Sequence, residues 1–139
     1  MITKHVGGVG AVIVNKNNQF LILQKNVHPP FWEFLKGTPK PNEPYAKLLQ
    51  REIKEETGIT DYAIVDGFKH SIQYDFQAPD AHIFRTVDYV LVKTDQEPVI
   101  SDEHLDYKWV TLKEAEKFFQ NENFRDLARR ASEFLNKHV

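Results

Sequence analysis

Residues 37–59 read GTPKPNEPYAKLLQREIKEETGI, and this stretch carries the clearest local signal in the chain. Pro44 suits the first turn of a helix, where the N–H that proline lacks would have no partner in any case. Gly58 stands where a left-handed C-terminal cap belongs. Apolar residues recur between them at helical spacing, at Ala46, Leu49 and Ile53. The pattern therefore predicts a helix over residues 44–57.

Three carboxylates share one side of this helix, because Glu52, Glu55 and Glu56 fall within an arc of roughly 100° at helical geometry. Like charges at these spacings repel one another, and Arg51 is the nearby basic residue that can offset them. Hard divalent cations such as Mg²⁺ or Mn²⁺ favour such oxygen ligands. Taken alone, the carboxylates also fit an ordinary solvated helix face, so both interpretations stay open on this feature.

The wider spacing of the segment decides between the two interpretations. It reads Gly, five residues, Glu, seven residues, Arg-Glu, aliphatic, any residue, Glu-Glu, any residue, Gly, aliphatic. If each fixed residue has a usage near ~7%, a chance match is on the order of 10⁻⁸ per starting position. The segment resembles the Nudix box at every position: Gly37, Glu43, Arg51, Glu52, Ile53, Glu55, Glu56, Gly58 and Ile59.

The resemblance implies an α+β fold of the Nudix type, an αβα sandwich with a mixed sheet between helices. It also implies hydrolysis of a nucleoside diphosphate linked to another group, with Mg²⁺ or Mn²⁺ bound. Arg51 would orient the glutamates by ion pairing, and Glu52 or a carboxylate outside the box would take the proton from the attacking water. Gly37 and Gly58 would allow the loops on either side of the helix to adopt their conformations. The metal ligands would be Glu52, Glu55 and Glu56.

Three further segments resemble asymmetrical diadenosine tetraphosphate hydrolases of that family. They are Trp32 with Lys36 and Gly37, residues 67–74, and residues 101–115. The resemblance implies cleavage of a dinucleoside polyphosphate to ATP and AMP. A nucleoside triphosphate or the 5′ end of an RNA is the alternative substrate, and a nucleotide-binding sensor without turnover is a weaker alternative, because such a protein should have a damaged metal helix.

Several residues outside the box are candidates for the site. Tyr74 and Tyr107 would clamp an adenine between two flat faces, although either could be an ordinary sheet aromatic. Glu103 would be an extra metal ligand or the base, although it could be an exposed acid. We expect Trp109 to lie in the core. The candidate phosphate contacts, each of which could instead be a solvated or structural side chain, are Lys36, Lys69, Arg85 and His104.

The chain departs from that subfamily on the phosphate side of the box. Residues 33–35 are Glu-Phe-Leu where the relatives usually carry a Pro-rich stretch. Thr38 and Asn42 also replace common residues of the loop. The preferred polyphosphate length is therefore left open by the sequence.

The rest of the chain predicts strands and two later helices. Strands are expected over residues 6–14, 20–23, 62–68, 70–76, 83–93 and 107–110, and helices over about 112–119 and 124–135. Residues 27–44 hold five of the prolines and predict an ordered loop with little regular structure. The early glycines, which we interpret as strand positions that allow close packing rather than a phosphate loop, are Gly7, Gly8 and Gly10.

Length and composition limit the classes of protein that fit. With 139 residues, 41% of them hydrophobic, we expect one globular domain over residues 1–139. A formal net charge of −2 supplies no overall basic field to hold DNA or another long nucleic acid, so a polyanionic partner would need a local basic site; the nucleotide partner is what the resemblance implies. The chain has no cysteine, which excludes disulfides and thiolate metal ligands. No signal peptide or apolar stretch long enough for a membrane helix is present, so we expect a cytoplasmic protein.

Overall fold

The computed structural model describes residues 2–138, which form a mixed seven-stranded sheet and three helices. The sheet path runs β3-β2-β1-β6-β5, with β4 beside β1 and β7 beside β2. β1 and β6 pair in parallel from Ile2 to Val14, and the remaining pairs are antiparallel. The elements are β1 (Ile2–Val14), β2 (Phe20–Lys25), β3 (Trp32–Glu33), β4 (Leu35–Gly37), α1 (Tyr45–Thr57), β5 (Ala63–Gln77), β6 (Ala81–Lys93), β7 (His104–Val110), α2 (Leu112–Phe118) and α3 (Glu122–Lys137).

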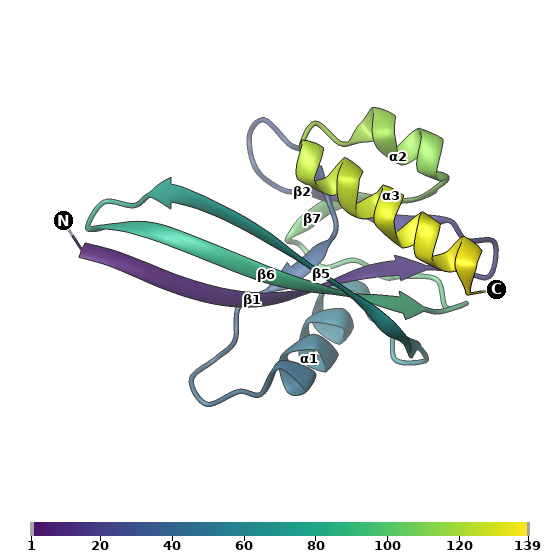
Figure 1. Cartoon of the computed structure of the whole chain (residues 1–139), viewed down its shortest axis with the longest axis horizontal. Coiled ribbons are helices and arrows are strands. Elements are labelled where there is room, and N and C mark those ends of the chain that lie inside the picture. The colour runs from purple at the N-terminus through teal and green to yellow at the C-terminus, as the bar shows by residue number, and fades with distance from the viewer. Residues whose placement is uncertain (1, 139) are drawn as a thin grey trace.

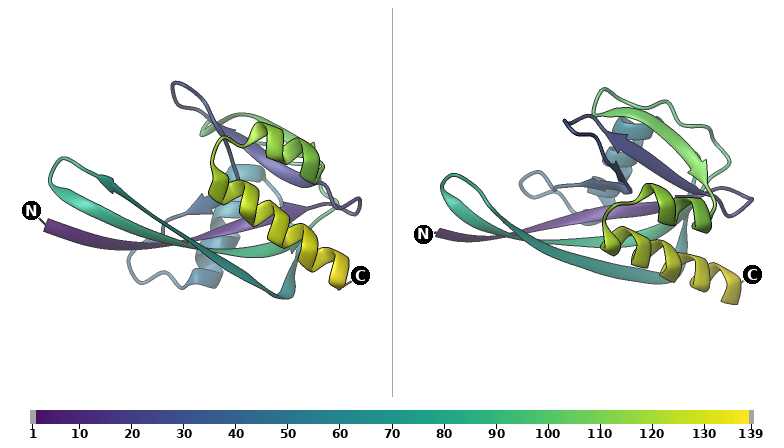
Figure 2. Two further views of the ribbon diagram at one scale, coloured as in Figure 1. Left: turned by 45° about the horizontal axis from the view of Figure 1, so that its top comes forward. Right: turned by 90° about the horizontal axis from the view of Figure 1, so that it is seen from above.

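Helix α1 covers one face of the sheet, and α2 and α3 cover the other (Figures 1 and 2). Alternation along β1 feeds both layers, because Val9, Ala11 and Ile13 join the core under α1 whereas Val12 and Val14 join the core under α3. The predicted α+β sandwich with a mixed sheet between helices is confirmed. No helix among residues 2–138 is long and apolar enough to cross a membrane.

The boundaries of α1 agree with the prediction to within one residue. The helix starts at Tyr45, with Pro44 in extended conformation as its N-terminal cap. Gly58 ends it with φ at 68°, and its N–H donates to the Lys54 carbonyl at 2.9 Å. A left-handed residue here favours glycine because it has no Cβ to clash.

The sheet contains more strand than the local sequence predicts. The loop expected over residues 27–44 includes β3 and β4, so that expectation was wrong in part. These two short strands exist because β2 and β1 offer them backbone partners, at Leu23 opposite Glu33 and Val9 opposite Gly37. Likewise, the two strands expected over 62–76 are one strand, β5, with an irregularity in its pairing. Such pairings join distant parts of the chain and leave little local pattern.

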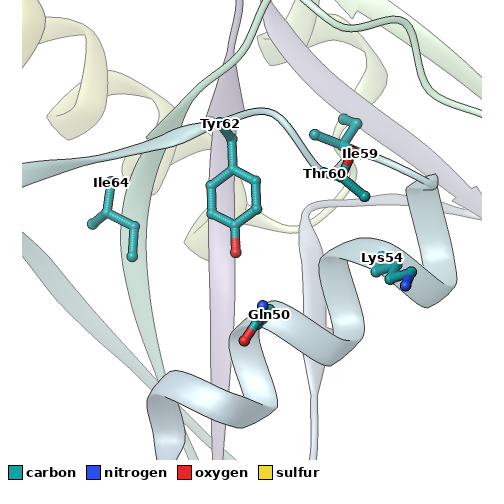
Figure 3. A pocket seen from close by; sticks show the side chains of 6 residues that line it. All are labelled: Gln50, Lys54, Ile59, Thr60, Tyr62 and Ile64. Atoms are coloured by element: carbon teal, nitrogen blue, oxygen red, sulfur yellow. The ribbon is translucent and has the colours of Figure 1, made fainter.

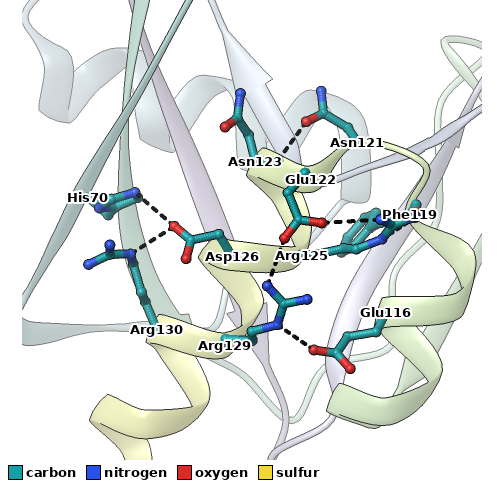
Figure 4. Close-up of polar contacts among 10 residues, drawn as sticks. All are labelled: His70, Glu116, Phe119, Asn121, Glu122, Asn123, Arg125, Asp126, Arg129 and Arg130. Carbon is teal, nitrogen blue, oxygen red and sulfur yellow. Dashed lines mark hydrogen bonds and ion pairs between the residues drawn. The ribbon is translucent and has the colours of Figure 1, made fainter.

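Polar contacts tie α3 to its neighbours (Figure 4). Arg129 on α3 contacts Glu116 of α2 at 2.5 Å and Glu122 at 2.8 Å. Asp126 lies between His70 of β5, at 3.7 Å, and Arg130, at 2.8 Å. These groups are largely solvent-exposed, so each pair adds little stability and the network chiefly sets the orientation of the helix.

The glycines of β1 leave room for side chains of other strands. A Cβ on Gly10 would lie 2.6 Å from Cδ1 of Tyr89, nearer still to Cε1 of the same ring, and 2.7 Å from the Leu35 carbonyl oxygen. A Cβ on Gly8 would lie 2.9 Å from the Gly37 carbonyl oxygen. Both distances are too short for a real contact, so the prediction that these glycines allow close packing is confirmed.

We therefore expect Gly10→Ala to lower the free energy of unfolding by about 1–3 kcal/mol, because the added methyl group overpacks the core. Urea denaturation monitored by circular dichroism measures the change. The control is Thr3→Ala on the exposed end of the same strand, where a change within about 0.5 kcal/mol is expected. Equal midpoints for the two variants would show that the strand tolerates a Cβ at residue 10.

Candidate active site

One polar hollow of about 300 Å³ is lined by five of the predicted site residues, Lys36, Glu52, Glu56, Arg85 and Glu103. It lies where the sheet divides, since β4 pairs with β1 while β3 and β7 pair with β2. We call this hollow the carboxylate pocket. Its lining residues are Lys25, Glu33, Lys36, Gly37, Thr38, Glu52, Glu56, Arg85 and Glu103.

Arg51 of α1 holds the loop before the helix against the helix itself. Its Nε and Nη2 donate to the two oxygens of Glu43, each at 2.8 Å. Its Nη1 donates to Glu52 at 2.9 Å and to Glu55 at 3.3 Å, and Nη2 also reaches the Thr38 carbonyl. These hydrogen bonds lower the pKa of Glu43 to about 2. The ion pairing predicted for Arg51 is present.

Glu52 packs against β4, the short strand that ends at Gly37. A Cβ on Gly37 would lie 2.7 Å from Oε1 of Glu52, so a larger residue here would displace the Glu52 carboxylate. Burial raises the pKa of Glu52, and the charges of Glu55 and Glu103 act in the same direction against the pull of Arg51. Gly37 therefore allows a carboxylate to lie directly on the backbone of β4.

Glu56 is a buried acid at the floor of the carboxylate pocket. It is 5% exposed, and burial is the main cause that raises its pKa to about 9, followed by a hydrogen bond with Glu103 and the charge of Glu52. The same hydrogen bond lowers the pKa of Glu103. Among residues 2–138, Oε2 of Glu56 has no hydrogen-bond partner. An unmatched buried oxygen beside two other carboxylates is a donor set that suits a hard divalent cation.

The carboxylates do not form a closed cage by themselves. Within the described part of the chain, no three acidic or imidazole groups meet the geometry of a metal site. Glu55 stands apart from the pocket: its side chain is 56% exposed and contacts Arg51 at 3.3 Å. Of the four predicted ligands, the structure thus brings Glu52, Glu56 and Glu103 into one pocket, whereas Glu55 does not line it and contacts Arg51 instead.

Two of the predicted phosphate contacts face the carboxylate pocket. Lys36 places its Nζ 3.3 Å from Glu33 and 5.9 Å from the centroid of the Tyr74 ring. Arg85 donates through Nη2 to the Thr38 hydroxyl at 2.5 Å, and its buried Nε has no partner in residues 2–138. Lys69, in contrast, is 69% exposed beside Asp88 and does not line this pocket.

His104 occupies a different environment from the one expected. Its side chain is 1% exposed, and Nε2 lies 2.9 Å from Oε2 of Glu33. A ring enclosed in this way cannot reach a phosphate in the pocket, so the predicted direct contact is corrected to a buried pairing with Glu33. Sequence could not show this, because the partner lies on a strand that was predicted as loop.

The two tyrosines expected to clamp a base lie on opposite faces of the sheet. Tyr74 packs against the core under α2 and α3, whereas Tyr107 packs against the core under α1. The Tyr107 hydroxyl donates to Glu97 at 3.3 Å, as does the indole N–H of Trp109 at 3.2 Å. One purine cannot sit between rings on opposite faces, so a clamp made of this pair is not what the fold provides. Trp109 packs against the core, as expected.

Glu33 and Lys25 line the pocket but were not among the predicted site residues. Glu33 lies between the apolar residues Trp32 and Phe34. A charged residue within an apolar run is unusual, and this signal in the sequence could have identified Glu33 as a candidate. Lys25 ends the apolar run of β2 and gives no comparable signal. Thr38, noted only as a departure from the subfamily, also lines the pocket.

A second hollow of about 470 Å³ lies beside α1, away from the acidic groups (Figure 3). Gln50 and Lys54 line it from the helix, and Tyr62 and Ile64 line it from the following segment. None of the residues that line it is acidic. It therefore offers none of the chemistry of the carboxylate pocket.

Comparison with known proteins places these features in one family. The family model described as NUDIX domain matches residues 4–131. Asymmetrical bis(5′-nucleosyl)-tetraphosphatase of Mus musculus is 29% identical over 126 residues, covering 87% of this chain and 83% of that protein. RNA pyrophosphohydrolase of Nitratiruptor sp. is 30% identical, covering 76% and 77%. The crystal structure of a C. elegans Ap4A hydrolase binary complex superposes with a TM-score of 0.83 at 30% identity, covering 95% and 98%.

The buried acid Glu56 predicts how the stability of the metal-free protein depends on pH. Its pKa is about 9 in the folded chain against an ordinary value of 4.5, so between these values the folded state keeps a proton that the unfolded state releases. The free energy of unfolding should therefore fall as pH rises through this range. Glu56→Gln removes this contribution, so its melting temperature relative to the native protein should rise by several degrees between about pH 5 and about pH 9.

Differential scanning fluorimetry with a chelator present measures this difference. Glu116→Gln, on the exposed face of α2, serves as the control and should keep a constant offset from the native protein. A constant offset for Glu56→Gln as well would mean that Glu56 is ionised in the metal-free fold.

Proposed function

Since the chain belongs to the Nudix hydrolase family, we propose that its carboxylate pocket binds a divalent cation and hydrolyses a nucleoside polyphosphate by attack of water at phosphorus. The observation that carries this proposal is the gathering of Glu52, Glu56 and Glu103 in one pocket with Lys36 and Arg85. Acidic and basic groups in the same pocket suit a substrate that is itself a metal-bound polyanion.

The metal ligands in this proposal are Glu52, Glu56 and Glu103, with Glu55 joining from outside the pocket. Mg²⁺ or Mn²⁺ bound there would supply positive charge to the phosphate oxygens and lower the pKa of an attacking water. The donor set is made of oxygens, and the unmatched oxygen of Glu56 lies among them. Deprotonation of Glu56 accompanies binding of the cation, because an acid that holds its proton cannot serve as an anionic ligand.

The remaining residues act on water and on phosphate. Glu52 or a carboxylate outside the box, such as Glu103, accepts the proton of the attacking water. Lys36 and Arg85 bind phosphate oxygens and draw charge away from the phosphorus that is attacked. Arg51 contacts no substrate in this proposal: it keeps Glu52 oriented by the 2.9 Å hydrogen bond to that carboxylate.

We propose diadenosine tetraphosphate as the substrate, cleaved asymmetrically to ATP and AMP. Support comes from the asymmetrical tetraphosphatase and the Ap4A hydrolase structure to which the chain is similar over most of its length. Tyr74 places an aromatic ring beside Lys36, whose ammonium lies 5.9 Å from the ring centroid, so an adenine that stacks on this tyrosine would lie next to the phosphate-binding cation once the ammonium turns to the phosphate. The second candidate is the triphosphorylated 5′ end of an RNA, favoured by the similarity to RNA pyrophosphohydrolase.

A substrate panel tests this assignment. With Mg²⁺ present, we expect kcat/KM on diadenosine tetraphosphate to exceed that on ATP and on triphosphorylated RNA by at least about tenfold. Chromatography should resolve ATP and AMP as the products, rather than two molecules of ADP. A higher efficiency on RNA ends would transfer the assignment to the second candidate.

Substitution of a proposed ligand tests the site itself. Glu52→Gln keeps the size of the side chain but removes its charge and its basicity, so kcat should fall at least about 100-fold. Steady-state assays at saturating Mg²⁺ measure the effect. Glu133→Gln, an exposed change on α3, should leave kcat unchanged. Activity of Glu52→Gln within a few-fold of the native protein would remove Glu52 from the site.

A further inference from the structure

Glu33 is a buried carboxylate to which the proposed reaction assigns no step. It lies on β3, is 3% exposed, and lines the carboxylate pocket. Oε1 accepts a hydrogen bond from Lys36 at 3.3 Å, and Oε2 lies 2.9 Å from Nε2 of His104. Both of its oxygens therefore have partners, whereas Oε2 of Glu56 has none among residues 2–138.

Two roles are open to a carboxylate in this position, metal ligand or anchor for other side chains. Each oxygen of Glu33 already has a nitrogen partner in the metal-free fold, whereas Oε2 of Glu56 has none among residues 2–138, so Glu56 is better placed than Glu33 to meet a cation. Burial acts to raise the pKa of Glu33, but the His104 hydrogen bond and the charge of Lys36 outweigh it and lower the pKa. The group is thus an anion held by its partners, which favours the role of anchor.

Of the two partners of Glu33, Lys36 has the more flexible side chain, so a hydrogen bond to Glu33 restricts its position more. A lysine side chain has four rotatable bonds, so its ammonium group ordinarily samples many positions. Here the ammonium lies between the Glu33 carboxylate and the face of the Tyr74 ring, at 5.9 Å from the ring centroid. An ammonium has three donors, so one engaged by Glu33 leaves others for a phosphate in the pocket.

His104 connects the other oxygen of Glu33 to the turn that carries Glu103. The His104 N–H donates to the Ser101 carbonyl at 3.2 Å, and Asn26 donates to the Glu103 carbonyl at 3.0 Å. The pairing of His104 with Glu33 thus joins β3 to the residue that follows Glu103. One carboxylate thus contacts both Lys36 and the residue that follows Glu103.

We propose that Glu33 is a positioning residue that holds the Lys36 ammonium at the phosphate side of the carboxylate pocket while its other oxygen secures His104 beside Glu103. The inference rests on the proposed function in one respect, that Lys36 meets a substrate phosphate. It adds a specificity element at a place where the chain departs from the Pro-rich stretch of its subfamily. Because Glu33 acts through Lys36, its loss should weaken phosphate binding only while Lys36 is present.

A double-mutant cycle in substrate binding tests this coupling. The variants are Glu33→Gln, Lys36→Met and the double variant, and the probe is a methylene-bridged, non-hydrolysable diadenosine tetraphosphate with Mg²⁺. We expect Glu33→Gln to raise Kd, measured by calorimetry, about tenfold in the native background and less than about twofold in the Lys36→Met background. Equal losses in both backgrounds, or no loss at all, would overturn the proposal. Glu133→Gln, which breaks an exposed Glu–Lys pair of 3.0 Å, is the matched control and should leave Kd unchanged.

A second measurement separates this inference from the substrate assignment. Lysine-selective ¹H–¹⁵N NMR without nucleotide should show a slowly exchanging ammonium signal that disappears in Lys36→Arg and in Glu33→Gln. A Lys36 signal that is absent from the native protein, or that persists in Glu33→Gln, would overturn the positioning role whatever the substrate is. Where the native protein fails to bind the probe but the signal behaves as expected, the proposed substrate fails and the positioning role stands. If Glu33→Gln does not fold, Glu33→Asp, which keeps the charge but is one methylene shorter, takes its place in both tests.

Discussion

The guanidinium group of Arg51 is the contact on which the rest of the pocket depends. It binds both oxygens of Glu43 at 2.8 Å and also reaches Glu52 and Glu55. The planar fork of arginine can satisfy several carboxylates at once, which a lysine ammonium cannot do with the same geometry. The loop before α1 is therefore fastened to the helix, and Gly37 at the start of that loop lies against Glu52. Without this cation, three helical carboxylates would repel one another with little to offset the repulsion.

Two buried glutamates show how neighbours decide the state of an acid. Glu33 and Glu56 are similarly buried, yet the pKa of Glu33 is lowered and that of Glu56 is raised. Glu33 faces Lys36 and His104, so its charge is compensated within the protein. Glu56 faces Glu52 and Glu103, so its charge is opposed. In the proposed function, Glu33 is therefore ionised without a metal cation, whereas Glu56 needs a metal cation to ionise.

The spacing of residues along the chain predicted those parts of the fold that depend only on neighbouring residues. Helix α1, its glycine cap and the close-packing glycines of β1 each follow from neighbouring residues, and the structure has them. Strands β3 and β4 were not predicted, because they depend on partners far along the chain rather than on their own residues. For the same reason His104 was expected at a phosphate and lies instead against Glu33. The face of the sheet on which Tyr74 and Tyr107 lie likewise depends on strand register, which differs for β5 and β7.

The sequence by itself determined the family, the helix that carries the three glutamates and the class of reaction, because these are carried by residue types at fixed spacings within one stretch, residues 37–59. Only the tertiary structure decided which side chains share the pocket. Glu33, Lys36, Arg85 and Glu103 come from separate elements, and they meet because the sheet divides between β1 and β2. A pattern along the chain can specify one helix face, since its geometry is set by neighbouring residues. The meeting of three distant segments, around residues 33–36, 85 and 103, is set by strand pairing, and no short stretch of sequence contains that information.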